Sequence, residues 1–157
     1  MESPRVAVVG AGSFGRNHIR ILRDFPGAEL AGVVDTNPER LAGLECPVWD
    51  DVRQLAGRAD AAVVAVPTTA HADVGCCLLE AGMDVLVEKP IAPDLAGGRR
   101  LIDAAEANGR ILQVGHLERF NPAVQALLRA ATIPLFFEIH RIACSARGAS
   151  TWTSCWT

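Results

Sequence analysis

The sequence predicts an α/β fold with a doubly wound parallel sheet. Over the first 115 residues, short apolar runs alternate with longer segments whose apolar residues recur at helical spacing. A glycine-rich turn, 10–15, joins the first apolar run to the first of these segments. Repeated strand–helix alternation implies crossover connections between parallel strands. The chain has 157 residues, about the size of one domain.

Six strands and four helices are predicted along this part of the chain, and a fifth helix follows it. The run 61–66 is continuously apolar, as expected of a strand that is covered on both faces. Pro26 and Gly27 end the first helix, and Gly82 and Gly109 end two later ones. The predicted strands are 5–9, 29–34, 46–49, 61–66, 83–87 and 110–114, and the predicted helices are 14–25, 38–44, 69–81, 95–108 and 121–131, followed by a strand within 135–142 whose partner is left open.

Composition and charge argue against several classes of protein. The formal net charge is −3 and no basic block is present, so neither a nucleic-acid partner nor a polybasic membrane patch is expected. No apolar run approaches the roughly 20 residues that span a bilayer, and no signal-peptide pattern precedes the first strand. A cytoplasmic protein is therefore expected. The five cysteines form no C-x-x-C pair, which favours buried thiols in a reducing compartment over metal ligands.

The turn 10–15 has the pattern G-x-G-x-x-G, which is weak evidence alone but here follows a strand and opens a helix. In such a turn Gly10 permits the tight bend, Gly12 lets the backbone approach a pyrophosphate, and Gly15 lets the helix pack on the strand. The free N–H groups at the helix N-terminus then attract the anion. The alternative is an ordinary strand–helix turn, with Asp35 as a solvated cap.

Asp35 ends the second predicted strand, 20 residues after Gly15. An acidic side chain at this place accepts hydrogen bonds from the adenosine ribose hydroxyls. Because its charge would repel a 2′-phosphate, NAD is favoured over NADP as the cofactor. Arg40 lies nearby in the sequence, which leaves the use of both dinucleotides open. The sequence therefore predicts a dinucleotide-binding Rossmann domain.

Three further segments, 67–71, 88–90 and 115–122, lie where later strands should end. Ligands of open α/β sheets bind outside the carboxyl ends of the strands. With these segments, the chain resembles the Gfo/Idh/MocA oxidoreductase family over about residues 5–142. The resemblance rests on the glycine turn, Asp35, Pro-Thr-x-x-His, Glu-Lys-Pro, and Gly-His before Glu-Arg-Phe-Asn-Pro. The last segment is most similar to a branch that includes UDP-N-acetylglucosamine 3-dehydrogenase-like proteins.

The resemblance implies two catalytic residues. Lys89, of the Glu-Lys-Pro motif, is expected to contact the substrate hydroxyl and assist proton transfer, because an amine held beside a cationic nicotinamide becomes less basic. A cis peptide often precedes the equivalent of Pro90 in this family and would aim Lys89 into the cleft. His116 is expected near the nicotinamide and the substrate. The alternatives are a surface lysine before a proline and a structural histidine bonded to the backbone.

The resemblance also implies cofactor contacts outside the glycine turn. Thr68 and His71 are expected near the pyrophosphate or the nicotinamide ribose, and Glu88 is expected to orient Lys89 or that ribose. For His71 the alternative is a residue at a helix N-terminus without a ligand. The full set of expected cofactor contacts is Gly10, Gly12, Ser13, Phe14, Gly15, Asp35, Thr36, Pro67, Thr68, His71, Glu88 and Lys89, and no metal is expected.

The C-terminal part of the chain departs from the family. Its members carry a second α/β domain that covers the substrate and builds the oligomer, with an Asp-x-x-x-His pair whose histidine is the usual acid/base. No histidine follows His140 in this chain, and no aspartate follows Asp103. The expected organisation is a dinucleotide-binding domain at 1–119, the truncated start of a substrate domain at 120–143 and an aberrant tail at 144–157.

A shifted reading frame would account for that tail. The genetic code allows residues 151–157 to be encoded by a nucleotide sequence that, when read from its third base, encodes Val-Asp-Val-Val-Leu-Asp-Leu. This peptide is similar to the family's segment leading to Asp-x-x-x-His. The alternative is a natural short protein with a divergent tail. In either case the expectation is NAD binding with little or no turnover.

The leading functional hypothesis is an NAD-dependent dehydrogenase acting on a hydroxyl of a sugar, sugar nucleotide or cyclitol, with the cofactor carrying the hydride. Its expected partner is this small-molecule substrate, and full-length relatives are expected to be homo-oligomers. One alternative is a non-catalytic NAD-binding module. Another is a non-functional fragment, in which the strand within 135–142 would leave an aggregation-prone edge.

Overall fold

The computed structural model describes residues 3–130, so the strand expected within 135–142 and the tail 144–157 lie outside the described residues. The described chain forms two compact units, one up to Leu117 and one from Glu118. The strands of the first unit are β1 (Arg5–Val9), β2 (Glu29–Val34), β3 (Val48–Trp49), β4 (Ala61–Val64), β5 (Asp84–Val87) and β6 (Leu112–Val114). They form one parallel sheet in the order β3-β2-β1-β4-β5-β6, which confirms the predicted doubly wound fold.

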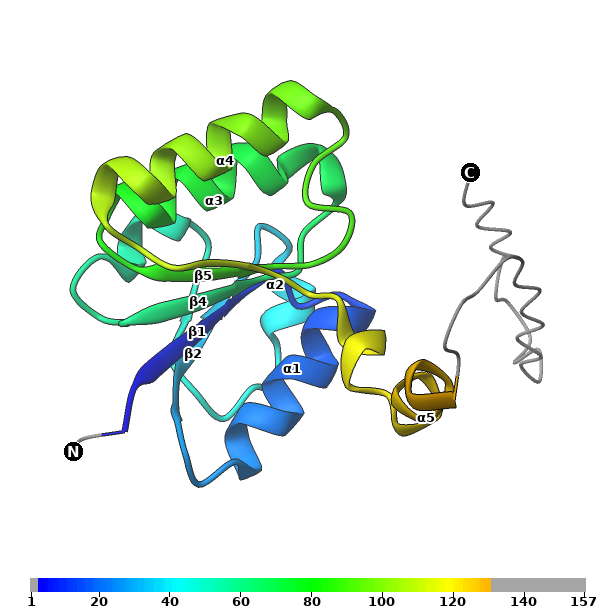
Figure 1. The fold of residues 1–157 in the computed structure, drawn as a ribbon. Helices are drawn as coiled ribbons and strands as arrows, with labels where there is room; N and C mark the ends of the chain where they lie inside the picture. The colour runs from blue at the N-terminus through cyan, green and yellow to red at the C-terminus, as the bar shows by residue number, and fades with distance from the viewer. Residues whose placement is uncertain (1–2, 131–157) are drawn as a thin grey trace. The chain divides into compact units, whose positions relative to one another are not determined.

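Helices cover both faces of this sheet. Figure 1 shows α1 on one face, and α3 and α4 together on the other. The helices of the first unit are α1 (Ser13–Asp24), α2 (Pro38–Leu41), α3 (His71–Glu80) and α4 (Leu95–Asn108), with short 3-10 turns η1 (Val52–Leu55), η2 (Thr68–Ala70) and η3 (Leu117–Phe120), the last of which runs into the second unit. Within residues 3–130, no helix is long and apolar enough to cross a bilayer.

Several elements are shorter than predicted. The helix expected over 38–44 is a single turn, because Ala42, with φ −58° and ψ 131°, already leaves the helical conformation. The helix expected from Thr69 begins at His71, because residues 68–70 form the tighter turn η2. The strand expected over 61–66 leaves the ladder after Val64. Each difference falls at an element end, where hydrophobic periodicity carries the least information.

The central strand β1 is buried on both faces, and its side chains alternate between two apolar clusters. Ala7 and Val9 pack in the larger cluster together with Leu78 and Leu101 of α3 and α4. Val8 packs in the smaller cluster with Ile19 of α1. Two-sided burial explains why the strand is apolar at consecutive positions instead of every second one.

The cysteines of the described region behave as small buried or half-buried hydrophobes. Cys76 is buried in the larger cluster, as predicted, while Cys46 and Cys77 are half-buried; all three are free thiols. Burial raises the pKa of each of these thiols. A raised thiol pKa keeps the reactive thiolate scarce at neutral pH, so these cysteines suit packing better than chemistry.

An exposed ion pair joins β1 and β4 at the amino ends of the strands. The Arg5 guanidinium donates to both carboxylate oxygens of Asp60, with Nη2–Oδ1 at 2.7 Å and Nε–Oδ2 at 3.2 Å. The backbone N–H of Arg5 also donates to Oδ2, at 2.8 Å. These hydrogen bonds lower the pKa of Asp60 from 3.8 to about 2.

Replacing Asp60 with asparagine is expected to lower the thermal stability slightly at neutral pH, since exposed pairs contribute little. A carboxyl whose pKa is depressed in the folded state stabilises the fold above its ordinary pKa, and this stabilisation is lost as the pH falls through the folded value. The difference in melting temperature between wild type and Asp60→Asn should therefore be constant above pH 4 and shrink between pH 4 and about 2. A difference that grows on acidification would contradict this assignment.

In the second unit, residues just before the helix fix its N-terminus. Its helix α5 (Pro122–Ala130) begins with proline at a first-turn position, where the missing N–H costs nothing. Asn121 precedes the helix, and its Oδ1 accepts from the Ala123 N–H at 2.9 Å. Its Nδ2 donates to Glu118 Oε2 at 2.7 Å. Asn121 is therefore the N-terminal cap of α5.

Candidate functional site

The glycine turn between β1 and α1 is held by close backbone contacts. Gly10 has a φ of +98°, and a Cβ at this residue would lie 2.6 Å from the Ala65 carbonyl oxygen. A Cβ at Gly15 would lie 1.7 Å from the Gly10 carbonyl oxygen, so α1 packs directly against the turn. At Gly12, by contrast, nothing lies within 4 Å of the place of a Cβ. The turn thus leaves open space at its middle glycine.

The N-terminus of α1 faces this open space with unpaired backbone donors. Gly12 is the N-cap and supplies no side-chain cap. The Gly12 carbonyl accepts the helical hydrogen bond from the Arg16 N–H at 2.9 Å. The N–H groups before Arg16 therefore have no partner within the helix, and together with the helix dipole they favour an anion. Ser13 and Phe14 are exposed beside them.

Asp35 ties the glycine turn to the end of β2. Its carboxylate is buried, and Oδ2 accepts from the Ala11 N–H at 2.7 Å while Oδ1 accepts from the Asn37 N–H at 2.8 Å. The Arg40 guanidinium lies 3.6 Å from Oδ2 and is half exposed. A carboxylate has about four lone-pair sites, so Asp35 can hold the turn and still accept from a ligand hydroxyl.

A cleft of about 870 Å³ opens at the carboxyl ends of the central strands. It lies where the strand order reverses between β1 and β4, which is the usual ligand site of open α/β sheets. The predicted residues that line it are Gly10, Gly12, Ser13, Phe14, Asp35, Thr36 and Pro67. Gly15, Thr68, His71, Glu88, Lys89 and His116 do not line it.

Part of the cleft wall was not predicted from the sequence. Asp50, Asp51, Val52 and Gln54 follow β3 and line the cleft beyond Asp35. They stand at the carboxyl end of a strand, so the rule that places ligands at such ends could have identified them. The predicted strand 46–49 ends at Trp49, as β3 does, but the prediction did not extend the site to the residues after it.

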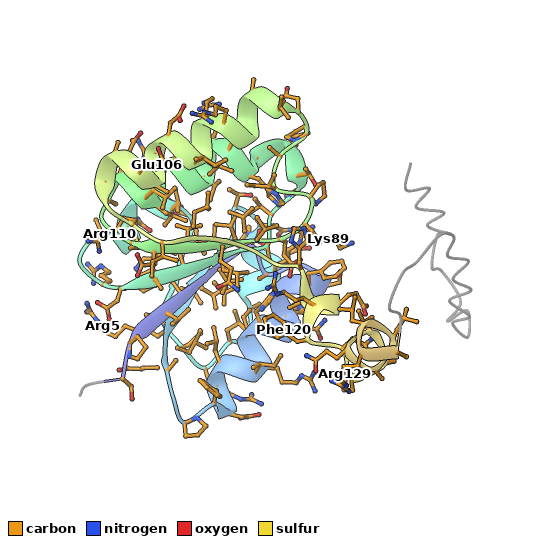
Figure 2. The ribbon with its side chains drawn as sticks, viewed as in Figure 1. Arg5, Lys89, Glu106, Arg110, Phe120 and Arg129 are labelled. Carbon is orange, nitrogen blue, oxygen red and sulfur yellow. The ribbon has the colours of Figure 1, made fainter. Side chains whose placement is uncertain are left out.

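The two residues predicted to be catalytic lie at the ends of neighbouring strands. Lys89 follows β5 and His116 follows β6, and the last ladder pair of these strands is Val87 with Val114. Both side chains are exposed. Figure 2 places Lys89 at the opposite end of the sheet from Arg5 and Arg110. The predicted cis peptide between Lys89 and Pro90 is present.

Glu88 is buried and has a partner that was not predicted from the sequence. Its Oε1 lies 2.8 Å from Nε2 of His18, a half-buried residue of α1. Its Oε2 accepts from the backbone N–H of Lys89 at 3.3 Å. A Cβ at Gly115 would lie 3.2 Å from the same oxygen, so a glycine leaves room for this carboxylate.

His71 does not have the surroundings expected of a cofactor ligand. Its side chain is 1% exposed, its Nδ1 lies 2.9 Å from the Pro90 carbonyl oxygen, and its Nε2 lies 3.0 Å from the Val66 carbonyl oxygen. Both ring nitrogens are thus engaged by the backbone, and neither faces the cleft. The direct cofactor contact expected of His71 is therefore replaced by a link between two loops.

The residues around the cleft fit a dinucleotide. The open space at Gly12 admits a pyrophosphate beside the free N–H groups of α1. The Asp35 carboxylate stands at the end of β2, where a ribose could donate its hydroxyls. Among residues 3–130, no group of three or more His, Cys, Asp or Glu side chains could hold a metal ion.

These features define a Rossmann dinucleotide-binding domain. The chain belongs to the Gfo/Idh/MocA family, since the family model described as an oxidoreductase family with an NAD-binding Rossmann fold matches residues 4–116. Membership of this family of oxidoreductases confirms the resemblance identified in the sequence.

Three relatives illustrate the similarity. UDP-N-acetylglucosamine 3-dehydrogenase of Acidithiobacillus ferrooxidans is 34% identical over 88% of this chain and 45% of its own. Inositol 2-dehydrogenase 4 of Saccharopolyspora erythraea is 40% identical over 80% of this chain and 40% of its own. The crystal structure of the WlbA dehydrogenase of Bordetella pertussis with NADH and UDP-GlcNAcA has a TM-score of 0.77 and 30% identity, covering 82% of this chain and 39% of that one. The chain thus spans less than half the length of these relatives.

Proposed function

We propose that this chain binds NAD as the cofactor-binding part of a dehydrogenase that oxidises a hydroxyl of a sugar, sugar nucleotide or cyclitol. The observation that carries the proposal is the cleft formed by the glycine turn and Asp35 at the end of the sheet that also presents Lys89. The names of the relatives support this class of substrate. It stays a prediction that residues 120–143 begin a substrate domain. A cytoplasmic location of the protein stays a prediction as well.

The preference for NAD over NADP rests on the charge of Asp35. This buried carboxylate would meet the adenosine ribose, where it can accept from hydroxyls but repels a phosphate. Arg40 acts in the opposite sense, because its half-exposed guanidinium could pair with a 2′-phosphate. The carboxylate is the more deeply buried of the two groups, so less solvent screens its repulsion.

The chemistry assigned to this chain is binding, orientation and proton transfer. A bound nicotinamide supplies the acceptor for the hydride that leaves the substrate carbon. Lys89 contacts the substrate hydroxyl and assists the transfer of its proton to the acid/base histidine of the family's second domain, so that a C–H and an O–H bond are broken while the carbonyl forms. His116, at the end of the next strand, contacts the same hydroxyl and orients it.

Lys89 is the only lysine of the sequence, which allows a direct test of where the nicotinamide lies. Reductive methylation labels just two amines, Lys89 and the N-terminal α-amine, and peptide mass spectrometry separates them. NADH at saturation is expected to slow the methylation of Lys89 and leave the α-amine unaffected. Calorimetric titration should show tighter binding of NADH than of NADPH.

ADP is the matched control ligand, since it carries the adenosine and the pyrophosphate but no nicotinamide. It is expected to bind the same cleft and to leave the methylation rate of Lys89 unchanged. Equal protection by ADP and NADH would show that Lys89 does not adjoin the nicotinamide. Absence of NADH binding would overturn the proposed function.

A further inference from the structure

The residues on the two sides of Lys89 are each anchored by a histidine, while Lys89 itself is exposed. Glu88, before it, contacts His18 of α1, and Pro90, after it, contacts His71 of α3. The two histidines come from helices on opposite faces of the sheet (Figure 1). The backbone that carries the lysine is therefore held from both helical layers.

On the α1 side the anchor is a short contact to a buried carboxylate. The distance between His18 Nε2 and Glu88 Oε1 is 2.8 Å, and the two side chains are 17% and 9% exposed. The other oxygen of Glu88 accepts from the Lys89 backbone N–H, at 3.3 Å. A carboxylate removed from water needs such partners, so His18 fixes Glu88, and Glu88 fixes the backbone of Lys89.

On the α3 side the anchor is a backbone carbonyl. His71 Nδ1 lies 2.9 Å from the Pro90 oxygen, and its Nε2 lies 3.0 Å from the Val66 oxygen. A neutral imidazole donates to one of these carbonyls, and an imidazolium donates to both. Val66 lines the cleft, so His71 connects the cleft wall to the segment that follows Lys89.

We propose that His18 and His71 are positioning residues that hold Lys89 beside the nicotinamide by fixing Glu88 and Pro90. This inference rests on the proposed function, because it assumes that Lys89 meets the cofactor. Neither histidine needs to touch the cofactor or the substrate. Their effect should therefore appear in the placement of Lys89 and not in the affinity of the cleft for ADP.

The two histidines use different ring nitrogens, which gives a crossed test. The amide nitrogen of glutamine lies close to the place of Nε2, and that of asparagine lies close to the place of Nδ1. His18 holds Glu88 through Nε2, so His18→Gln should keep the contact and His18→Asn should lose it. His71 holds Pro90 through Nδ1, so His71→Asn should keep the contact and His71→Gln should lose it.

The readout is the protection of Lys89 from reductive methylation by saturating NADH in the 157-residue chain. His18→Asn and His71→Gln are expected to reduce this protection about fivefold, the factor that corresponds to the usual net contribution of one hydrogen bond. His18→Gln and His71→Asn should retain it, and all four variants should bind ADP with wild-type affinity. Arg20→Asn, at an exposed position of α1, is the control that should change nothing.

The outcomes separate this inference from the proposed function. If NADH protects Lys89 in the wild type and equally in all four histidine variants, the positioning role is wrong and the proposed function stands. Loss of protection in both the asparagine and the glutamine variant at either position would also overturn the positioning role. A packing defect would affect both variants, since it does not depend on where the amide nitrogen lies. Failure of NADH to protect wild-type Lys89 would overturn both proposals together.

Discussion

Replacing Gly15 with alanine is expected to destabilise the first unit by about 3 kcal/mol or more. The new Cβ would lie 1.7 Å from the Gly10 carbonyl oxygen, and a backbone atom cannot move aside as a flexible side chain can. Inserting a methyl group into a packed site commonly costs about 1–3 kcal/mol, and this contact is closer than a packed site tolerates. Urea denaturation followed by circular dichroism would measure the loss in the free energy of unfolding.

Gly12→Ala provides the matched control within the same turn. Nothing lies within 4 Å of the added Cβ, and the φ of −69° suits alanine, so the fold should keep its stability to within about 1 kcal/mol. The methyl group would instead occupy the open space proposed for the pyrophosphate. The variant should therefore fold normally and lose affinity for both NADH and ADP. Equal stabilities of the two glycine variants would contradict this division of roles.

Replacing Asp35 with asparagine is expected to lower the affinity for NADH by about ten- to a hundredfold. Hydrogen bonds to a charged group contribute about 1.5–3 kcal/mol, which corresponds to this range. Affinity for NADPH should fall less or rise, because the charge that repels the 2′-phosphate is removed. Calorimetric titration with both dinucleotides would give the ratio of the two dissociation constants, and an unchanged ratio would contradict the assigned role.

Asparagine also weakens the link between β2 and the glycine turn, since one of the two oxygens that accept from Ala11 and Asn37 becomes a nitrogen. A comparison of ADP with NADH does not separate this effect, because both carry the same ribose. Arg40→Gln instead tests the contribution of the positive charge to cofactor selectivity. This variant should bind NADPH more weakly and bind NADH with an affinity close to that of the wild type. Equal losses for the two dinucleotides would show that Arg40 contributes no selectivity.

The first part of the site could be predicted because its signals lie close together in the sequence. The apolar run 5–9, the glycine turn and Asp35 all fall within one strand–helix–strand unit, and each pattern has a direct physical cause. The strand end after Val64 was predicted two residues too late, because Ala65 and Val66 are as apolar as a strand but line the cleft instead.

Contacts between distant segments could not be predicted in the same way. His18 and Glu88 are 70 residues apart, and nothing local to either one indicates the other. His71 follows a proline-containing turn and resembles a residue at an open helix start. Its burial depends on the Pro90 carbonyl, 19 residues later, which single-sequence periodicity does not report.

The position of β1 in the sheet has a consequence for how the chain folds during its synthesis. β1 leaves the ribosome before the other five strands of this sheet, yet it occupies the centre of the sheet, between β2 and β4. β2 follows soon, but about fifty residues separate the end of β1 from the start of β4, and they must be made before β4 can cover the other edge of β1. At roughly 5–20 residues per second, that edge stays unpaired for several seconds in each nascent chain. An unpaired apolar edge is a template for association with other chains, so this interval is the time at which a nascent chain of this fold most needs protection by a chaperone.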